Sequence, residues 1–453
     1  MHRHLFAAVA TIALPVVQAL GFHTPSPDSY WQVSPAINYS DPLYAGWPQL
    51  KVDTEVLVYK GTELNRTYAH HPELYYDGKR VFLQYSTSPI DEDSIGQESW
   101  LSTSTDGGFT WSKGYSILPA ALLPNQTDAA NYTYWCDNRI WQRALHPAAW
   151  VPIDADHLYA VSQTTLRYCW GDDAKGTKAA GRIARLIDKT GRPVGDPCWT
   201  SQSEWTDVVR FNETIYGKKY GMKFCKHAAQ IEAYLKQPAK VPAWGTWLYQ
   251  TKLYAADDTH DMQEPTHAVW FANATHPGGG GGGYWERFWR DISSSDIISN
   301  AVWVERTSSP NGTNWYPSIE QQHGNNIFKT NIPDAGSKQH FGTLPNGDRF
   351  LLHNPRNNSE KTRQPLTIAT SRGAAGRDGG GGGGGGGGDG GVYRGIGVLR
   401  TNASTVIAPD TRKLKRAMFS YPTAILVEGK LVVGYSENKE NIWVSVVDPK
   451  NLL

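Results

Sequence analysis

The sequence predicts an all-β fold, most economically a single β-propeller, and three observations support this. Short runs of alternating apolar and polar residues recur along the chain, turn pairs such as Asp-Gly and Gly-Gly separate them, and Trp and Tyr are abundant, at 18 and 23 residues. Alternation broken by such turns is typical of antiparallel strands, and aromatic residues fill propeller cores as well as contacting sugar faces. With blades of about 60 residues, the chain of 453 residues would form seven blades, with six as the alternative.

The clearest strand pattern lies near the N-terminal end of this region. Strands are expected at Glu73–Tyr76 and Arg80–Ser86, joined by the turn Asp77-Gly78, and a third strand is expected at Glu98–Thr103. The segment Ser104–Trp111 follows, with the spacing Ser-x-Asp-x-Gly-x-Thr-Trp. In this spacing the Asp caps a tight turn, the Gly permits it and the Trp packs against the sheet. We interpret it as a self-contained hairpin with a structural role.

Strand patterns continue along most of the remaining chain. They cover Gln49–Val52, Thr54–Lys60, Trp141–Gln163, Gly181–Ile187, Trp247–Tyr254, His267–Phe271, Gly342–Asn354, Gln364–Ser371, Ile396–Arg400, Thr423–Val427, Lys430–Ser436 and Ile442–Val447. Short helices are expected at Ser203–Val209 and His227–Gln237. The glycine runs at 276–283 and 378–391 cannot form a core, and strand patterns resume on both sides of each. We therefore expect mobile surface loops within one domain.

The N-terminus has the pattern of a secretory signal peptide. Basic residues in Met1–His4 precede the apolar run Leu5–Val17, and small residues around Ala19 suit cleavage. We expect residues 1–20 to be removed and residues 21–453 to form a secreted, extracellular, monomeric propeller. The acceptor pattern for N-glycosylation, typical of a eukaryotic secretory route, occurs at Asn65, Asn125, Asn131, Asn212, Asn273, Asn311 and Asn402. A net charge of +1 argues against nucleic acid or a membrane surface as the main partner.

Four cysteines in an oxidising compartment indicate two disulfides. Three pairings are possible, and sequence proximity favours Cys136–Cys169 with Cys198–Cys225. A metal site is a poor alternative, because the cysteines form no C-x-x-C pair and the histidines do not cluster in the sequence.

Three separated stretches resemble the sialidase-like β-propellers, whose repeats contain the Asp-box. The first comprises His70-His71-Pro72, Glu92 to Gln97 and the hairpin Ser104–Trp111. The second and third run from Gly342 through Asn354-Pro355 to Arg363–Ser371, and from Tyr421-Pro422 to Ile442. Within this group the chain looks most like fungal secreted L-rhamnose-α-1,4-D-glucuronate lyases. That resemblance implies a polysaccharide lyase that releases terminal rhamnose from arabinogalactan and gum arabic.

One departure from the sialidase pattern bears on activity. Sialidases carry a Phe/Tyr-Arg-Ile-Pro motif early in the chain, in which the Arg holds the sialate carboxylate. This sequence has Ala69-His70-His71-Pro72, so His70 stands where that Arg would be. The departure argues against sialidase activity and leaves the predicted propeller unaffected.

β-Elimination from a glucuronate needs a group that neutralises the carboxylate, a base for the C5 proton and a donor for the departing oxygen. Arg suits the first role, His the second, and Tyr or a second His the third. The candidate catalytic residues are His70, His71, Arg139, Arg167, Tyr168 and His227. Several of them lie beside cysteines, where a disulfide would hold a binding loop rigid. The alternative interpretation is that these histidines and arginines have structural roles.

A second group of residues is expected to contact the substrate. It comprises Gln97, Trp135, Asn138, His340, Asn354, Arg363, Tyr421 and Glu437. The resemblance implies that Tyr421 and Glu437 lie near the positions of a sialidase's nucleophilic Tyr and its Glu partner, although Tyr421 could equally be a core residue. Arg363 could bind a carboxylate or form a surface ion pair. Glu92 and Asp93 could act as acids in a hydrolase or lie in a solvated loop.

The sequence thus predicts a secreted exo-polysaccharide lyase acting on a carbohydrate with a terminal acidic-sugar linkage. The alternatives are an exo-glycoside hydrolase on the same fold, either an α-L-rhamnosidase or a sialidase-like enzyme, and a non-catalytic sugar-binding propeller. No organic cofactor is expected, because no Gly-rich loop joins a strand to a helix. A structural calcium in the propeller channel is compatible with the sequence.

Overall fold

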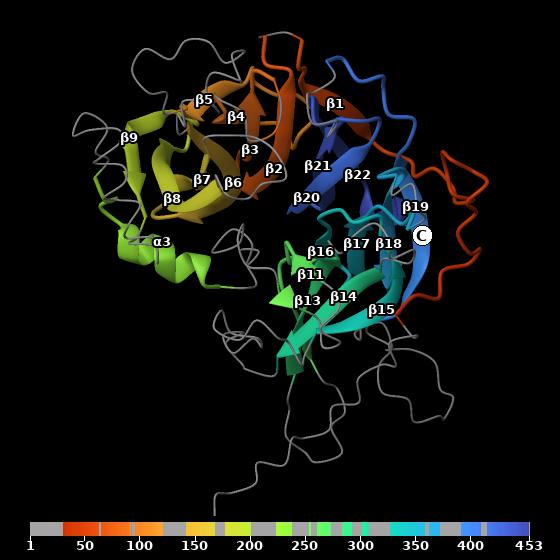
Figure 1. Cartoon of the computed structure of the whole chain (residues 1–453). Coiled ribbons are helices and arrows are strands. Elements are labelled where there is room, and N and C mark those ends of the chain that lie inside the picture. Colours follow the sequence, from red (N-terminus) through yellow and green to blue (C-terminus); the bar gives the residue numbers. More distant parts are fainter. Residues whose placement is uncertain are drawn as a thin grey trace, which may run out of the picture.

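In the computed structural model, the described strands form five antiparallel sheets that fan around a common axis (Figure 1). The structure describes residues 30–62, 65–90, 92, 96–120, 142–167, 177–200, 223–237, 253–254, 261–272, 283–291, 301–307, 327–357, 362–371, 391–408 and 415–452. The predicted helix at Ser203–Val209 lies outside these residues. So do the two predicted glycine-rich loops, except for the last glycine of each, Gly283 and Gly391.

We number the sheets as blades in chain order. Blade 1 contains β2 (Tyr68–Tyr76), β3 (Val81–Ser88), β4 (Glu98–Ser104) and β5 (Tyr115–Leu118). Blade 2 contains β6 (Gln142–Pro152), β7 (His157–Arg167), β8 (Thr177–Asp188) and β9 (Pro193–Trp199). Blade 3 contains β10 (Leu253–Tyr254), β11 (Asp261–Gln263), β12 (Val269–Ala272), β13 (Gly283–Asp291), β14 (Ala301–Thr307) and β15 (Ile327–Pro333). Blade 4 contains β16 (His340–Thr343), β17 (Arg349–His353), β18 (Leu366–Ser371) and β19 (Tyr393–Arg400). Blade 5 contains β20 (Phe419–Val427), β21 (Lys430–Glu437), β22 (Asn441–Val447) and β1 (Thr54–Tyr59), and a 3₁₀ turn follows at Pro449–Asn451.

The predicted all-β propeller is confirmed, whereas the described strands form five blades and not the predicted seven. The prediction assumed that the whole chain consists of compact blades of similar length. Two segments of the chain do not fit this assumption. A long segment that includes a helix separates β9 from β10, and blade 3 alone extends from Leu253 to Pro333.

Both ends of the described chain build the same blade. Strand β1 pairs antiparallel with β22, with Thr54 opposite Val446, so an early strand completes the last sheet. Figure 1 shows β1 beside the blue strands of blade 5. This pairing joins the first and last blades, and it removes an exposed edge that could pair with another chain.

Apolar clusters between neighbouring blades form the core. One cluster joins Phe82 and Leu101 of blade 1 to Trp150 of blade 2, and another joins Leu83 of blade 1 to Val432 of blade 5. Similar clusters join blade 5 to blade 4 and blade 4 to blade 3. Because side chains alternate between the two faces of a strand, each blade can pack against neighbours on both sides.

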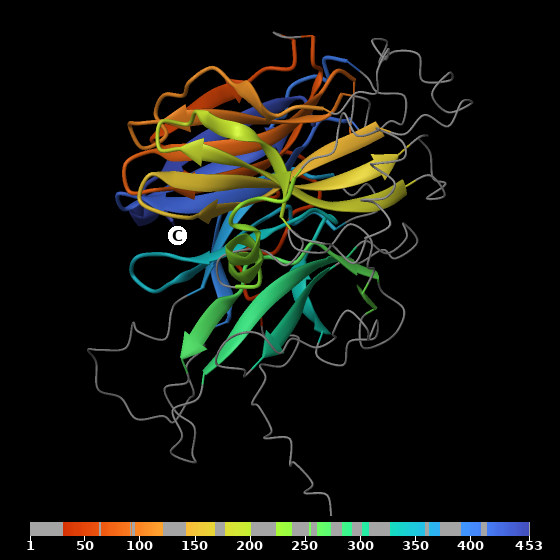
Figure 2. The ribbon, with the colours of Figure 1, turned by 90° about the vertical axis from the view of Figure 1, so that its left-hand side faces the viewer.

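Helix α3 (Ala228–Leu235) packs on the face of blade 2 that is turned away from blade 1. Ile231 and Leu235 are buried against Val151 and Val161. Figure 2 shows the helix between the strands of blade 2 and those of blade 3. The helix expected at His227–Gln237 is therefore confirmed, with slightly narrower bounds. Among the described segments, no helix is both long and apolar enough to cross a membrane.

The hairpin at Ser104–Trp111 has the structural role that its sequence predicts. Asp106 accepts hydrogen bonds from the backbone N–H of Thr110 at 2.9 Å, the Thr110 hydroxyl at 2.6 Å and the Ser104 hydroxyl at 2.7 Å. Gly107 and Gly108 have φ values of 74° and 97°, which only glycine adopts readily. A side chain at position 108 would lie 3.2 Å from Val432, so the hairpin of blade 1 packs closely on blade 5.

Substitution of Asp106 by Ala should destabilise the protein by about 1–3 kcal/mol, because three donors in the hairpin lose their acceptor. Urea unfolding followed by tryptophan fluorescence measures this change. The exposed neighbour Lys113 provides the control, and Lys113→Ala should stay within about 0.5 kcal/mol of the native protein. Equal midpoints for the two variants would contradict the proposed structural role of the hairpin.

Candidate active site

Four X-Pro pairs bring polar side chains to the axis of the propeller. They are His71-Pro72 in β2, His146-Pro147 in β6, Glu264-Pro265 after β11 and Tyr421-Pro422 in β20. The strand register shifts at three of these pairs, and the fourth separates β11 from β12, which both pair with β13. Such bulges redirect a side chain out of the regular alternation.

Three residues of these pairs have unusual backbone conformations. The φ angles of His71, Glu264 and Tyr421 are 54°, 55° and 56°. Residues with a side chain seldom adopt positive φ, and such strain is concentrated at functional sites. The strained positions come from three different blades and meet at one place, which marks that place as the candidate active site.

Tyr421, Glu264 and Arg290 form the centre of the site. The Tyr421 hydroxyl donates a hydrogen bond to Glu264 Oε1 at 2.6 Å. Arg290 Nη1 donates to Glu264 Oε2 at 2.6 Å and to the Tyr421 hydroxyl at 2.9 Å. Burial and the Glu264 carboxylate raise the pKa of Tyr421 above its ordinary value. Burial also tends to raise the pKa of Glu264, but Arg290 and the Tyr421 hydroxyl outweigh it and hold that pKa below its ordinary value.

Two further arginines lie beside this centre. The guanidinium carbon of Arg363 is 5.9 Å from the centre of the Tyr421 ring, and its Nη2 donates to the Gly336 carbonyl at 2.8 Å. Burial and the charge of Arg290 lower the pKa of Arg363 to about 10. Arg416 is close enough to Arg290 for their repulsion, in addition to burial, to lower the pKa of Arg416. Positive charges held this close together favour an anionic ligand.

Histidines line the side of the site formed by blades 1 and 2. The rings of His70 and His71 lie 4.2 Å and 5.1 Å from that of Tyr421, and the His146 ring lies 4.9 Å from that of His71. Burial, with the nearby His71 and Lys439, holds the pKa of His70 well below its ordinary value. His70 is therefore a neutral imidazole at neutral pH, and it is fully buried.

Glu92 links the histidines to the last blade. Its Oε1 lies 3.6 Å from His71 Nε2, and Lys439 donates a hydrogen bond to its Oε2. Burial alone would raise the pKa of Glu92, but the Lys439 ammonium beside it holds that pKa well below its ordinary value. Glu92 was expected either to act as an acid or to lie in a solvated loop, and it lies within the cluster.

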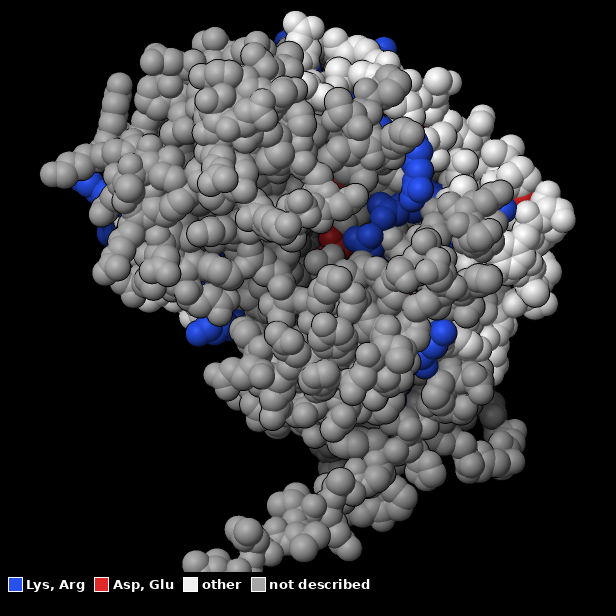
Figure 3. Space-filling view, viewed as in Figure 1, with Lys and Arg blue, Asp and Glu red and all other residues white. Residues whose placement is uncertain are grey.

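A metal ion could be held by His70, His71 and Glu92, whose ligand atoms lie within 4.8 Å of one another. The Lys439 ammonium already binds the Glu92 carboxylate, and Arg363 is also close to His70. These charges oppose a second cation, so the donor set fits a metal poorly. On the face shown in Figure 3, Lys and Arg atoms border a central hollow in which acidic atoms are visible.

The structure brings four of the predicted site residues together, namely His70, His71, Arg363 and Tyr421. The partner of Tyr421 is Glu264, whereas Glu437 accepts hydrogen bonds from Asn441, Trp443 and the backbone of Ser404. Gln97 and Asn354 are also buried in structural roles. Gln97 donates to the Leu145 carbonyl, and Asn354 donates to the carbonyls of Arg363, Pro365 and Phe419.

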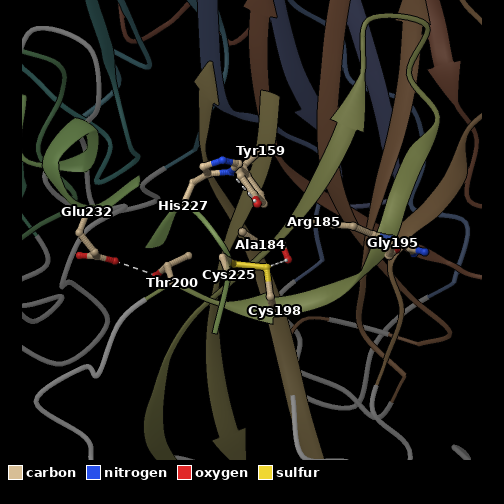
Figure 4. Close-up of a disulfide and its surroundings, with 9 residues drawn as sticks. All are labelled: Tyr159, Ala184, Arg185, Gly195, Cys198, Thr200, Cys225, His227 and Glu232. Carbon is tan, nitrogen blue, oxygen red and sulfur yellow. Dashed lines mark hydrogen bonds between the residues drawn. A yellow bond between two sulfur atoms is a disulfide. The ribbon is translucent and has the colours of Figure 1, made fainter. Parts of the chain in front are cut away.

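The remaining predicted residues lie elsewhere. His340 is at the start of β16, where its ring stacks on Phe350. His227 precedes helix α3, and its Nδ1 lies 3.4 Å from the Tyr159 hydroxyl (Figure 4). The side chain of Arg167, at the end of β7, is outside the described atoms. Further expected residues lie outside the described segments, namely Trp135, Cys136, Asn138, Arg139, Tyr168 and Cys169.

The predicted pairing of Cys198 with Cys225 is confirmed. The two Cα atoms are 4.9 Å apart, and the bond joins β9 to the segment that leads into α3 (Figure 4). It therefore fixes the helix against blade 2, at a distance in the fold from the Tyr421 cluster.

Glu264, Arg290, His146 and Lys439 are site residues that were not predicted from the sequence. Proline offers a signal for two of them, because Glu264 and His146 precede Pro just as His71 and Tyr421 do. Nothing local distinguishes Arg290 or Lys439 from surface residues. Their roles depend on contacts between blades.

Comparisons with known proteins agree with the propeller fold. A family model described as "Beta-prop_BT_1020:-like, N-terminal beta propeller" matches residues 57–225, less than half of the chain. A solved structure named "Sialidase" matches 92% of this chain and 35% of its own, with 16% sequence identity and a TM-score of 0.61. The chain has a sialidase-like β-propeller fold. It spans about a third of the length of that structure.

Two other solved structures are more distant. Trypanosoma rangeli sialidase in complex with sialic acid has 10% identity and a TM-score of 0.44, with 89% of this chain and 60% of that chain covered. The intramolecular trans-sialidase from Ruminococcus gnavus in complex with oseltamivir carboxylate has 10% identity and a TM-score of 0.43, with 87% and 97% covered. A search of curated proteins finds no match. These comparisons do not support the narrower resemblance to rhamnosyl-glucuronate lyases.

The buried carboxyl of Asp334 should make stability depend on pH. Burial, opposed by Arg290, raises the pKa of Asp334 to about 7, whereas an unfolded Asp titrates near about 3.9. Between these values the unfolded chain is ionised and the folded chain is protonated, so stability falls as pH rises from about 4 to about 7. Asp334→Asn removes this loss, and its advantage over the native protein should grow across that range by up to about 4 kcal/mol.

Urea unfolding at several pH values measures this difference. The exposed Asp196 provides a control, because Asp196→Asn should follow the native pH profile. If the difference between Asp334→Asn and the native protein does not change with pH, Asp334 is ionised in the folded state and the prediction is wrong.

Proposed function

We propose that this protein is an exo-acting glycoside hydrolase that removes a terminal sugar bearing a carboxylate, with Tyr421 as the nucleophile. The observation that carries the proposal is the hydrogen-bonded group of Tyr421, Glu264 and Arg290 at the propeller axis. Tyrosine serves as the nucleophile in sialidases. A neutral hydroxyl can approach a carbon next to a carboxylate with less repulsion than an acidic side chain would meet.

The geometry supports a reaction in two steps. In the first step the Tyr421 oxygen bonds to the anomeric carbon as the bond to the leaving oxygen breaks, and Glu264 takes the phenolic proton. Arg290 stabilises the developing phenolate because it already donates to that oxygen. In the second step water displaces the Tyr421 oxygen, the phenolic proton returns from Glu264, and the proton of the water passes to the group that protonated the leaving oxygen.

The leaving oxygen also requires a proton. His71 is the candidate donor for this role, with the Glu92 carboxylate beside it, because the His71 ring is 5.1 Å from that of Tyr421 and its Nε2 is 3.6 Å from Glu92. The substrate carboxylate would bind Arg363 and Arg416, where charge repulsion is already present and an anion relieves it.

β-Elimination is the second candidate, and one observation favours it. The ring of His70 lies 4.2 Å from that of Tyr421, so the imidazole could take a C5 proton from a uronate while Tyr421 protonates the departing oxygen. The substrate would then be the rhamnosyl-glucuronate end of an arabinogalactan. Elimination leaves an unsaturated uronate that absorbs ultraviolet light, and hydrolysis does not.

Substitution of Tyr421 by Phe should abolish the covalent step, and Glu264→Gln should lower kcat by roughly 10²–10⁴-fold. Release of sugar from fluorogenic sialosides and uronides and from gum arabic measures this loss. Tyr435→Phe is a matched control, because it also removes a buried hydroxyl, which hydrogen-bonds Ser445 on blade 5. Tyr421→Phe retaining more than about a tenth of the native rate would sink the nucleophile assignment.

The two reaction types should separate in one assay on gum arabic and acidic glycosides. We expect sugar release without new ultraviolet absorbance, and the same substrates as neutral methyl esters should react far more slowly because Arg363 and Arg416 have no anion to bind. Absorbance that increases in step with sugar release would show elimination instead. In that case His70→Ala should lose activity and Glu264→Gln should retain most of it.

A further inference from the structure

A second hollow lies further along the same inner strands. Its volume is about 470 Å³, and it is lined by β2, β6, β12, β16, β20 and helix α3. In β2 the active-site residues are His70 and His71, and the lining residues are 73–75. In β20 Tyr421 belongs to the active site, and residues 423–426 line the hollow. The cavity therefore lies on the same axis but beyond the Tyr421 cluster.

A buried ion pair lies between the cavity and the active site. Lys338 donates to Glu73 at 2.7 Å, and both side chains are almost fully buried. Glu73 lines the cavity, and Lys338 is close enough to Glu264 to help lower the pKa of that carboxyl.

The cavity differs from the active site in its chemistry. Trp270 and Trp285 form one wall, with their rings 5.3 Å apart at 63°, and Trp270 is 36% exposed. His267 and His340 lie together on the wall, with rings 5.3 Å apart. Burial and the neighbouring His267 hold the pKa of His340 well below its ordinary value, so this ring is neutral. Glu73 is neutralised by Lys338, so the described lining offers aromatic faces and imidazoles but no free charge.

We propose that this cavity binds an uncharged sugar. The C–H face of a pyranose packs on tryptophan, and its hydroxyls need donors and acceptors such as imidazole nitrogens. The volume lies within the usual range for small-ligand sites, about 300–1,000 Å³. Among the described lining residues an anionic sugar would find no free cation.

The two hollows would then recognise different parts of a heteropolysaccharide. The active site takes its acidic end, and the cavity takes a neutral residue of another branch or another chain. Binding at the cavity does not depend on the proposed reaction, because it uses none of the groups around Tyr421.

Titration of the full chain with neutral galactose, arabinose and their short oligosaccharides tests the proposal. Tryptophan fluorescence should change saturably in the millimolar range, and Trp270→Ala should weaken binding by about tenfold or more. His267→Leu, which keeps the volume but not the hydrogen bonds, should also weaken it. Phe109→Ala, which removes an exposed aromatic ring on the blade 1 hairpin, is the matched control and should bind as the native protein does.

The Tyr421→Phe variant distinguishes the two sites. Neutral sugars should bind it with the native affinity even if it has no activity. Loss of binding in that variant would place the sugar in the active site and overturn the proposal. So would the absence of any saturable response, or an equal response from Trp270→Ala and Phe109→Ala. Urea midpoints of the variants exclude unfolding as the cause.

Discussion

The pairing of β1 with β22 is the constraint on which the rest of the structure depends. It places the first and last blades side by side, although their strands are at opposite ends of the sequence. The backbone N–H of Ala69 then donates to the Lys439 carbonyl at 2.9 Å, and the Lys439 side chain binds Glu92. The contact between His70 of blade 1 and Tyr421 of blade 5 also depends on these two blades lying side by side. Without this closure the histidines and Tyr421 would belong to separate surfaces.

Buried charge at the axis explains which ligand the site suits. The cations are Arg290, Arg363, Arg416 and Lys439, and the carboxylates that hold a negative charge are Glu264 and Glu92. Burial of charge is costly unless it is paired. Burial and the repulsion of Arg290 lower the pKa values of Arg363 and Arg416, and a carboxylate bound near them would offset that repulsion.

Local sequence patterns predicted what is local in the structure. The hairpin at Ser104–Trp111, the helix before Gln237 and the bond between Cys198 and Cys225 all depend on residues close in the chain. The number of blades was predicted wrongly, because the segment between β9 and β10 and the long blade 3, from Leu253 to Pro333, both depart from the assumed blade length.

The candidate site was predicted only in part, because its residues meet through contacts between distant parts of the chain. Glu437 was expected beside Tyr421 because of the resemblance to sialidases, but the carboxylate that binds Tyr421 is 157 residues away on another blade. The Glu437 carboxylate instead accepts hydrogen bonds from Asn441 and Trp443 of β22 and from the backbone N–H of Ser404. Contacts across the axis leave no periodic trace in the chain, so only the repeated proline could have indicated them.

The proline that follows His71, Glu264 and Tyr421 suggests how a propeller can bring different side chains together at one site. An ordinary inner strand directs alternate side chains into the blade interfaces, where His71, Glu264 and Tyr421 would be unsatisfied among apolar residues. The positive φ at each of these residues costs about 1–3 kcal/mol. The inter-blade clusters on either side hold the strands in place and offset that strain. Because each bulge acts within its own strand, the residue before proline can differ from blade to blade without disturbing the sheet. One fold can therefore present a histidine, a carboxylate and a tyrosine to the same ligand.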